Sequence, residues 1–354
     1  MRDFAIPLDA YTFELPEELI AQTPVRPRDA SRLCALTAEG QLEHRVFHDL
    51  PDLLAPGDLV VLNTTKVMPA RLHVRRDTGG RVELLPYHPR DGRVEEARHW
   101  ECLGRPGKVL QPGVILHADD GTELVVLNRR DDVVEVRGDK ALWDLMCSYG
   151  RVPLPPYVRR RTHRSGDAMD YQSIFARELG AVAAPTASLH FTDRVFQALR
   201  RRGIGVAEVV LHVGPGTFLP IRREYAEDVR QHAMHEETYW VPEETQRAVE
   251  ATRRAGRRVV AAGTTVVRAL ETWAQQGRDS GRSSLFIYEG FRFCVTDAMV
   301  TNFHLPRSTL LLLVAAFVGR SRILSLYAEA IVRRYRFFSF GDAMLLHHMP
   351  GAVC

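Results

Sequence analysis

The chain has few cysteines, and they are not arranged in pairs. Its 354 residues include only five, an odd number with no Cys-x-x-Cys spacing: Cys34, Cys102, Cys147, Cys294 and Cys354. This pattern argues against a disulfide framework or a zinc ribbon and favours a reducing compartment. No charged segment followed by an apolar core opens the chain, so we expect no secretory signal and a cytoplasmic protein.

Long apolar runs and nucleotide-binding fingerprints are also missing. The longest apolar run, 310–318, is much shorter than the roughly 20 residues that span a bilayer, so we expect a buried helix there and no membrane contact. No Gly-x-Gly-x-x-Gly loop follows an early strand, which argues against an ordinary methyltransferase.

The pattern of apolar residues and turns predicts an α/β protein with two domains. Residues 1–70 and 151–354 alternate strands and helices, as in a larger α/β domain with a mixed-sheet or barrel core. Expected strands include 59–62, 206–213, 257–262 and 285–288, and expected helices 194–202, 242–255, 264–276, 308–318 and 323–334. Residues 71–150 carry short alternating runs separated by Gly-rich turns, which predicts an inserted small antiparallel β-barrel domain.

Six loop-like stretches in the second half combine Gly or Pro with polar residues. They are 183–192, 211–218, 232–237, 262–265, 301–306 and 339–342. Several follow an apolar run that is typical of a strand, and ligands of open α/β sheets bind where strands end. We therefore expect these loops to gather around one pocket.

The stretch 259–271 predicts a strand that ends at Gly263 and a helix capped by a threonine. The first amides of such a helix carry partial positive charge, which suits a carboxylate, a phosphate or a ribose hydroxyl. Thr264, Thr265 and Arg268 are therefore candidate binding residues. The alternative is an ordinary helix cap.

Two histidines and a carboxylate, His232, His235 and Glu237, lie within six residues. Histidine suits general base work near neutral pH, and a neighbouring glutamate can hold the ring tautomer. Surface or structural histidines and a metal site are the alternatives. The spacing is not the His-Glu-x-x-His of zinc proteases, and no cysteine lies near, so we expect no metal.

Three further histidines, His190, His212 and His304, adjoin apolar stretches and turn residues. A single histidine of this kind is usually structural. Three of them, each beside a turn, favour a shared pocket.

Arginine dominates the positive charge, since only three of the 47 cationic residues are lysine and the net charge is +3. Arg159, Arg160 and Arg161 follow a proline-rich stretch that ends at Tyr157. Such a run is ordinarily a solvated face. Arginines beside a stiff aromatic loop also suit an RNA backbone and an unstacked base.

With these motifs in place, the chain closely resembles the S-adenosylmethionine:tRNA ribosyltransferase-isomerase family of queuosine biosynthesis. The resemblance covers essentially the whole chain, from LPEELIA at 15–21 and Pro-Gly-Asp at 56–58, through the six loops, to YRFFSFGDAM at 335–344. Two positions depart from the family pattern. Thr64 stands where an Asp is usual, and Ser188 stands where a Gly is usual.

The resemblance implies a reaction and its partners. The family moves the ribosyl part of S-adenosylmethionine, a co-substrate, onto 7-aminomethyl-7-deazaguanine at the first anticodon position of tRNA. Epoxyqueuosine-tRNA forms while adenine and methionine leave. The sulfonium acidifies the adjacent 5′ carbon, so the chemistry needs a base, a proton donor for adenine, a carboxylate clamp and a site without water. We expect a monomer.

The resemblance places the matching residues in the pocket, and we assign their roles as hypotheses. His235, paired with Glu237, is the first candidate for the base, and His232 is the second. Thr264, Thr265 and Arg268 would hold the methionine carboxylate, His304 and Asn302 would act at the adenine or sugar, and Asp342 would bind an ammonium or hydroxyl. The remaining candidates for substrate binding are His190, His212, Gly214, Gly216 and Thr217.

Two other functions remain open from the residues alone. A metal-dependent hydrolase would use the histidines as ligands. A non-catalytic RNA-binding protein would explain the arginines but not the acid–base residues of the loops.

The arginine run generates a prediction about salt dependence. A plot of the logarithm of tRNA affinity against the logarithm of salt concentration has a negative slope. Replacing Arg159, Arg160 and Arg161 with Ala should reduce the magnitude of this slope by roughly 0.7–0.9 for each phosphate that the variant no longer neutralises. Filter binding at several salt concentrations measures the slope. An unchanged slope would indicate that these arginines form a solvated face and do not contact tRNA phosphates.

Overall fold

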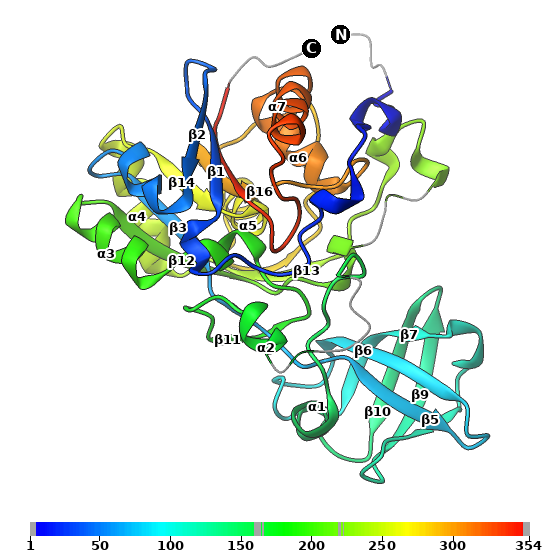
Figure 1. The fold of residues 1–354 in the computed structure, drawn as a ribbon. Coiled ribbons are helices and arrows are strands. Elements are labelled where there is room, and N and C mark those ends of the chain that lie inside the picture. Colours follow the sequence, from blue (N-terminus) through cyan, green and yellow to red (C-terminus); the bar gives the residue numbers. More distant parts are fainter. Residues whose placement is uncertain (1–4, 159–163, 165, 219–220, 222, 350–354) are drawn as a thin grey trace.

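The computed structural model describes residues 5–158, 164, 166–218, 221 and 223–349 (Figure 1). Arg159, Arg160 and Arg161 lie outside these residues. The described chain forms a large α/β domain and a smaller barrel (Figure 1). Backbone hydrogen bonds of 2.9 and 3.0 Å join Arg71 and Arg151, where the chain enters and leaves the barrel region.

A nine-stranded mixed sheet forms the centre of the large domain, in the order β15-β13-β12-β3-β14-β16-β17-β1-β2. The neighbours β12, β3, β14 and β16 run parallel to one another. The bounds of the strands are β1 Arg32–Leu36, β2 Leu42–Val46, β3 Leu59–Asn63, β12 Gly205–Leu211, β13 Glu237–Trp240, β14 Val259–Ala262, β15 Ser280–Ser283, β16 Ala298–Asn302 and β17 Ala343–His347. The carboxyl ends of the four parallel strands therefore lie at one edge of the sheet.

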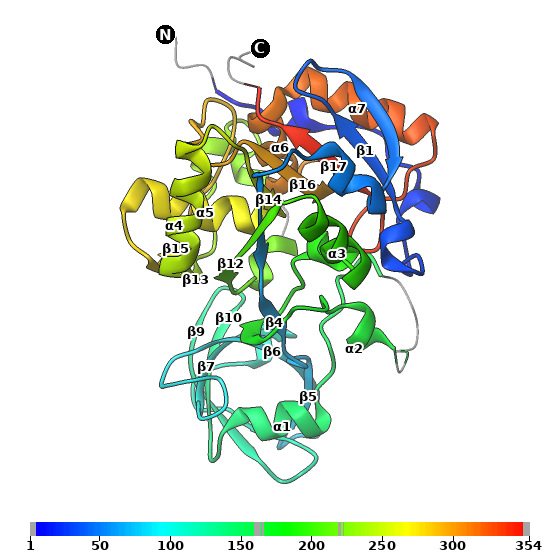
Figure 2. The ribbon, with the colours of Figure 1, turned by 90° about the vertical axis from the view of Figure 1, so that its left-hand side faces the viewer.

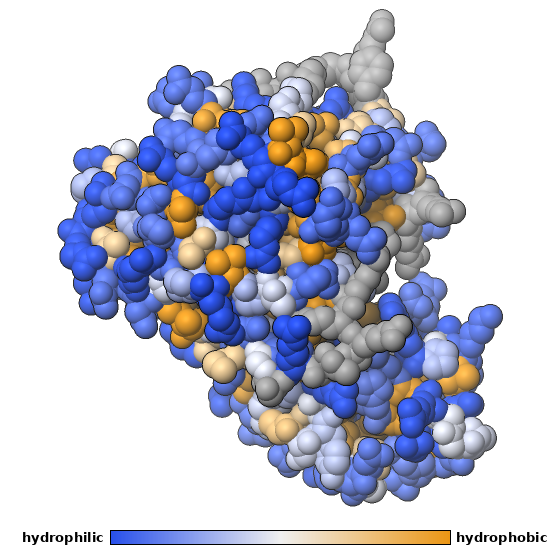
Figure 3. Space-filling model, viewed as in Figure 1, coloured by the Kyte–Doolittle hydropathy of each residue, from blue (hydrophilic) through white to orange (hydrophobic). Residues whose placement is uncertain are grey.

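Helices cover both faces of this sheet, which explains why its central strand β3 is buried throughout and apolar from Leu59 to Leu62. Val61 of β3 packs in a core with α4 (Glu243–Arg254), α5 (Thr264–Gln276), α6 (Thr309–Val318) and α7 (Arg320–Val332). Val60 and Leu62 face the opposite side and pack in a core with α3 (Asp193–Arg201). On the face drawn in Figure 3 the molecular surface is mostly hydrophilic, with small scattered apolar patches.

Six strands close into a barrel in the order β10-β7-β6-β5-β8-β9, and the pairings among them are antiparallel (Figure 2). Trp100 is fully buried in its core. The bounds are β5 Leu72–Arg76, β6 Arg81–Pro89, β7 His99–Arg105, β8 Ile115–His117, β9 Glu123–Arg130 and β10 Val133–Gly138, followed by α1 Leu142–Tyr149. Outside the barrel, β4 (Thr65–Val67) pairs with β11 (Glu178–Ala181), and a short helix α2 spans Asp167–Asp170.

The expected fold class is confirmed, with an open mixed sheet as the core of the large domain. One expected strand, 285–288, is wrong. The ladder is formed by β15 instead, while the Leu285 amide donates to Ser283 Oγ (3.3 Å) and Ile287 packs into the core. The apolar run there reflects burial without strand pairing.

No single described helix is long and apolar enough to cross a membrane. Helices α6 and α7 together meet that test of length and composition, but they are bent by 112° at the break between them.

A buried carboxylate fixes the start of the central strands. Asp58 accepts hydrogen bonds from the Ala55 amide (2.9 Å), the Arg258 amide (3.0 Å) and Arg258 Nε (3.0 Å), and it is 1% exposed. Burial opposes ionisation, but these hydrogen bonds outweigh it, so the pKa of Asp58 is lowered. The ionised carboxylate therefore stabilises the junction of β3 and β14.

Asp58→Asn should destabilise the protein by about 2–3 kcal/mol at neutral pH, because charged hydrogen bonds are lost. Since the folded-state pKa is lowered, this contribution is present above about pH 4 and is lost as the pH falls through the folded value. The difference in urea unfolding between wild type and variant should therefore shrink below about pH 4. The control is Asp52→Asn, which removes an exposed pair with Arg202 and should change stability by under about 0.5 kcal/mol. Equal effects of the two variants would contradict this account.

Candidate active site

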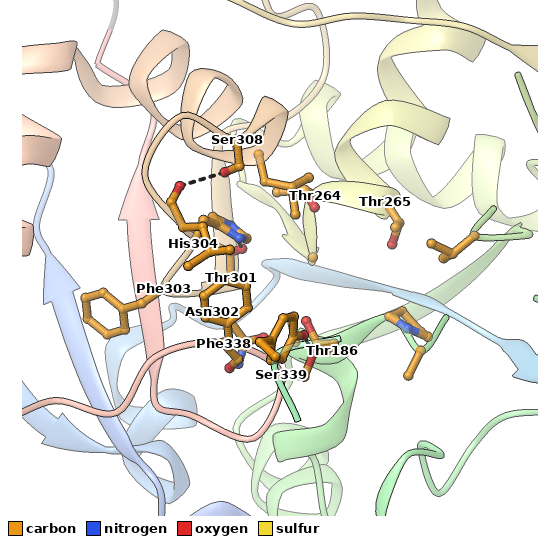
Figure 4. A pocket seen from close by; sticks show the side chains of 18 of the residues that line it. Thr186, Thr264, Thr265, Thr301, Asn302, Phe303, His304, Ser308, Phe338 and Ser339 are labelled. Atoms are coloured by element: carbon orange, nitrogen blue, oxygen red, sulfur yellow. Dashed lines mark hydrogen bonds between the residues drawn. The ribbon is translucent and has the colours of Figure 1, made fainter. Parts of the chain in front are cut away.

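A cavity of about 380 Å³ lies where the parallel strands end (Figure 4). Five of the six loops expected to gather line it, through residues 184–187, Val213, 263–265, 301–306 and Ser339. None of residues 232–237 is among its lining residues. Its described walls contain no Asp or Glu, and their titratable side chains are Tyr157, His304 and Arg307.

Helix α5 begins at this cavity, but its cap is not the expected threonine. Gly263 is the N-cap, with φ 110°, and it has no side chain with which to cap the helix. This left-handed conformation favours glycine, which explains Gly263 at the turn from β14 into the helix. Thr264 and Thr265 line the cavity, and Thr265 Oγ1 accepts from Asn63 Nδ2 (3.3 Å). The helix end and both hydroxyl-bearing residues therefore belong to the site.

Glu237 pairs with Arg268 of α5, which begins at the cavity, and not with His235 as expected. Glu237 Oε2 lies 2.7 Å from Arg268 Nη1, and both side chains are at most 3% exposed. Its other oxygen accepts from the Gly214 amide (3.0 Å). Nε and Nη2 of Arg268 are buried without a hydrogen-bond partner in the described chain. Arg268 is not among the residues that line the cavity.

The two other members of the histidine cluster lie outside the cavity. His235 is exposed and lies against Gly216, where an added Cβ would come within 2.7 Å of its Cδ2. The ring of His232 packs against Phe286, with centroids 5.2 Å apart. Thr217 follows Gly216 in a short turn of 3₁₀ helix, Pro215–Phe218.

His304 is the only histidine among the described lining residues. Its backbone amide donates to the Tyr327 hydroxyl (2.9 Å), and its Nε2 lies 2.9 Å from Thr301 Oγ1. Burial lowers the pKa of His304 to about 3. Within the described chain, Nδ1 has no hydrogen-bond partner. The ring is therefore neutral near pH 7 and has one nitrogen free to exchange a proton with a ligand.

His190 and Asn302 form a second buried polar group beside the cavity. His190 Nδ1 lies 2.7 Å from Ser31 Oγ, and its Nε2 lies 3.1 Å from Asn302 Nδ2. Burial, with Arg28 and Arg336 nearby, lowers the pKa of His190 to about 3. Asn302 lines the cavity, whereas His190 lies behind it.

A second, larger cleft of about 880 Å³ separates the barrel from the sheet domain. His212, Gly214 and Glu237 line it, together with His88 of the barrel. His212 Nδ1 lies 2.8 Å from Thr65 Oγ1, and burial followed by the nearby His88 lowers the pKa of His212 to about 4. Val213 lines the smaller cavity and Gly214 lines the cleft, so adjacent residues of the chain contribute to the two spaces.

Asp342 and Tyr157 hold the last loop in position. Asp342 accepts from the backbone amides of Arg32 (2.9 Å) and Arg336 (2.8 Å), so its carboxylate is engaged within the protein. The Tyr157 hydroxyl hydrogen-bonds Ser339, and its ring centroid lies 4.0 Å from that of Phe338. Tyr157 therefore forms part of the cavity wall.

Both departures from the family pattern are accommodated locally. Thr64 is buried, and its hydroxyl donates to the Val209 carbonyl (3.3 Å), away from the cavity lining. Ser188 is fully buried and its φ is not positive, so the backbone there does not require glycine.

Sequence analysis missed several residues of the site. Thr301 and Ser31 hydrogen-bond the two buried histidines, and Phe338 forms a wall. Thr301 directly precedes Asn302 at a strand end, which was an available signal. Ser31 is 159 residues from His190 and carries no signal in the sequence. In the described part of the chain, no group of three or more His, Cys, Asp or Glu side chains is placed to hold a metal ion.

Comparison with known proteins gives a consistent result over nearly the whole chain. A family model described as "Queuosine biosynthesis protein" matches residues 8–346. S-adenosylmethionine:tRNA ribosyltransferase-isomerase from Thermotoga maritima is 49% identical over 341 residues, covering 95% of this chain and 98% of that protein. The protein of the same name from Anaeromyxobacter dehalogenans (strain 2CP-C) is 49% identical over 352 residues, covering 96% and 99%.

A solved structure is also similar. The crystal structure of S-adenosylmethionine tRNA ribosyltransferase from Thermotoga maritima superposes with a TM-score of 0.54 and 40% identity. The superposition covers 95% of this chain and 99% of that one.

The buried pair of Glu237 and Arg268 leads to a prediction about stability, and the preceding residue, Glu236, provides a matched control. Glu237→Gln leaves the Arg268 charge buried without its partner and should cost about 3 kcal/mol or more in chemical denaturation. Glu236→Gln makes the same change in the exposed pair with Arg282 (2.9 Å) and should cost under about 1 kcal/mol. Similar unfolding midpoints for the two variants would contradict a stabilising role for the buried pair.

Proposed function

Because this chain belongs to the queuosine biosynthesis protein family, we propose that it transfers and isomerises the ribosyl moiety of S-adenosylmethionine onto 7-aminomethyl-7-deazaguanine in a tRNA anticodon. The products are epoxyqueuosine-tRNA, adenine and methionine. The observation that carries this proposal is the nearly full-length similarity to relatives that bear the name of this activity. We further propose that the protein acts as a monomer in the cytoplasm, in keeping with the free Cys34, Cys102, Cys147 and Cys294.

The smaller cavity is suited to the donor. Its volume of about 380 Å³ lies within the range of small-molecule sites, and apolar residues such as Leu305, Pro306 and Phe338 are among those that line it. The start of α5, with Thr264 and Thr265, offers partial positive charge to the methionine carboxylate. Arg268, one turn further along α5, has Nε and Nη2 without partners in the described chain, and its guanidinium would turn toward the cavity to reach that carboxylate.

His304 is the residue in the cavity best placed to move a proton. A neutral imidazole can take the 5′ proton that the sulfonium acidifies. Because burial lowers the pKa of His304 to about 3, the neutral ring is a weak base that depends on the acidity which the sulfonium gives the 5′ carbon, and the imidazolium formed readily passes the same proton to departing adenine. The sugar opens as adenine leaves, the amine of the acceptor base attacks, and an epoxide closes as methionine departs.

His235 with Glu237, and then His232, remain the alternative candidates for the base. They lie on the 232–237 loop outside the cavity, and Glu237 contacts Arg268 and Gly214. Either histidine would need this loop to move toward the donor. For Asp342, the engaged carboxylate favours a role in holding the 335–342 segment over direct ligand binding.

The larger cleft is suited to the acceptor nucleotide. It adjoins the donor cavity at Val213 and Gly214, and the carboxylates of Glu178 and Glu236 among its lining residues suit an aminomethyl cation. His212 and the Gly214–Gly216 stretch would contact the base at this boundary. Tyr157, with Arg159, Arg160 and Arg161 outside the described residues, would contact the tRNA backbone.

The decisive test is release of adenine. Purified protein incubated with S-adenosylmethionine and tRNA carrying the aminomethyl base should release adenine and methionine, as followed by chromatography. His304→Gln should lower the turnover number by at least about 100-fold. The control His73→Gln changes an exposed barrel histidine and should keep wild-type turnover.

Other outcomes separate the alternatives. Release of S-adenosylhomocysteine would indicate a methyltransferase, and tRNA binding without turnover would indicate an RNA-binding protein. Near-normal turnover of His304→Gln, with loss of turnover in His235→Ala, would indicate that the general base is on the 232–237 loop. Near-normal turnover of His235→Ala would end that assignment.

A further inference from the structure

The amide of Asn302 has a fixed orientation. Its Nδ2 lies 3.1 Å from the Phe338 carbonyl oxygen, 3.1 Å from His190 Nε2 and 3.5 Å from the Asp342 carbonyl oxygen. Carbonyl oxygens only accept hydrogen bonds, so the NH₂ group must face them and a flipped amide is excluded. The position of Oδ1 is therefore determined.

The neighbouring imidazole reinforces this orientation. Because Nε2 of His190 accepts from Asn302, the proton of the neutral ring is on Nδ1, which donates to Ser31 Oγ (2.7 Å). The ring also stacks on Phe47, with centroids 5.0 Å apart. Ser31, His190 and Asn302 thus form one directed hydrogen-bond chain that ends at Oδ1.

That oxygen has no hydrogen-bond partner in the described chain, although Asn302 is only 2% exposed. A buried acceptor without a donor is costly, and such groups in native proteins usually have a partner or a function. Asn302 lines the donor cavity, together with Phe338. Oδ1 itself has almost no accessible surface, so a flat ligand in the cavity would reach it with an N–H donor after a small displacement of the wall around Asn302.

We propose that Asn302 Oδ1 accepts a hydrogen bond from the exocyclic 6-amino group of the donor's adenine and so selects adenine over a 6-oxo purine. Ser31 and His190 are positioning residues that hold the acceptor. This inference rests on the proposed function, since it assumes that S-adenosylmethionine is the donor. The other polar end of the donor is accounted for by Thr264 at the start of α5, which Figure 4 shows on the opposite side of the cavity from Asn302 and Phe338.

Adenine and hypoxanthine present opposite hydrogen-bonding groups to Oδ1 at the 6 position. The 6-amino group of adenine donates two N–H bonds, whereas the 6-oxo group of hypoxanthine presents lone pairs to the lone pairs of Oδ1. A site built to bond a substrate N–H rejects the analogue that lacks it, because the buried protein group is left unpaired.

The test compares two donors on the full-length protein by equilibrium dialysis. S-adenosylmethionine should bind about 10- to 100-fold more tightly than S-inosylmethionine, its 6-oxo analogue. His190→Phe removes the acceptor that orients Asn302 and should reduce this ratio several-fold, while His190→Gln, which keeps an acceptor, should retain most of it. Structural damage alone would weaken both donors together and leave the ratio unchanged.

The outcomes separate this inference from the proposed function. Equal affinity of the wild type for both donors, with adenine release intact, would overturn the selection by Asn302 and leave the reaction standing. A ratio that is unchanged in a folded His190→Phe protein would overturn the positioning role of His190. Absence of both donor binding and adenine release would overturn the proposed function itself. The wild-type comparison requires no variant to fold.

Discussion

The parallel pairing of four central strands is the constraint on which the site depends. Because β12, β3, β14 and β16 point the same way, the loops that follow them open at one edge of the sheet. The chain leaves β14 through Gly263 into α5 and leaves β16 through Asn302 to His304, so residues far apart in sequence line one cavity. An antiparallel arrangement of these strands would send alternate loops to opposite edges.

Burial at and behind this cavity determines what His304 and His190 can do. His190 and His304 both have their pKa lowered to about 3, so each is neutral near pH 7. Their hydrogen bonds differ, and this difference divides their roles. Both ring nitrogens of His190 have protein partners, which makes it an element that orients Asn302. His304 has a protein partner in the described chain on one nitrogen only, which suits it to exchange protons.

Local patterns in the sequence predicted much of the fold. Turn-rich alternation indicated the barrel, and the Gly-Thr-Thr stretch indicated a helix at 264–276, which is the extent of α5. Contacts between distant residues were not predictable, because the packing of the sheet decides them. Proximity in sequence suggested His235 as the partner of Glu237, whereas the partner in the structure is Arg268, 31 residues away. The strand expected at 285–288 failed for a related reason, since burial alone does not specify which segment joins a ladder.

The Glu237–Arg268 pair connects the two spaces that the reaction would use. Arg268 belongs to the helix that begins at the smaller cavity, and Glu237 lines the cleft between the domains. Glu237 also accepts from the amide of Gly214, which adjoins Val213 in the donor cavity. One buried ion pair therefore holds Gly214, a lining residue of the cleft whose neighbour Val213 lines the cavity. A reaction that joins a donor sugar to an acceptor amine needs the two to meet at a fixed distance without admitting water, and a fixed backbone where the two spaces adjoin serves the first of these requirements.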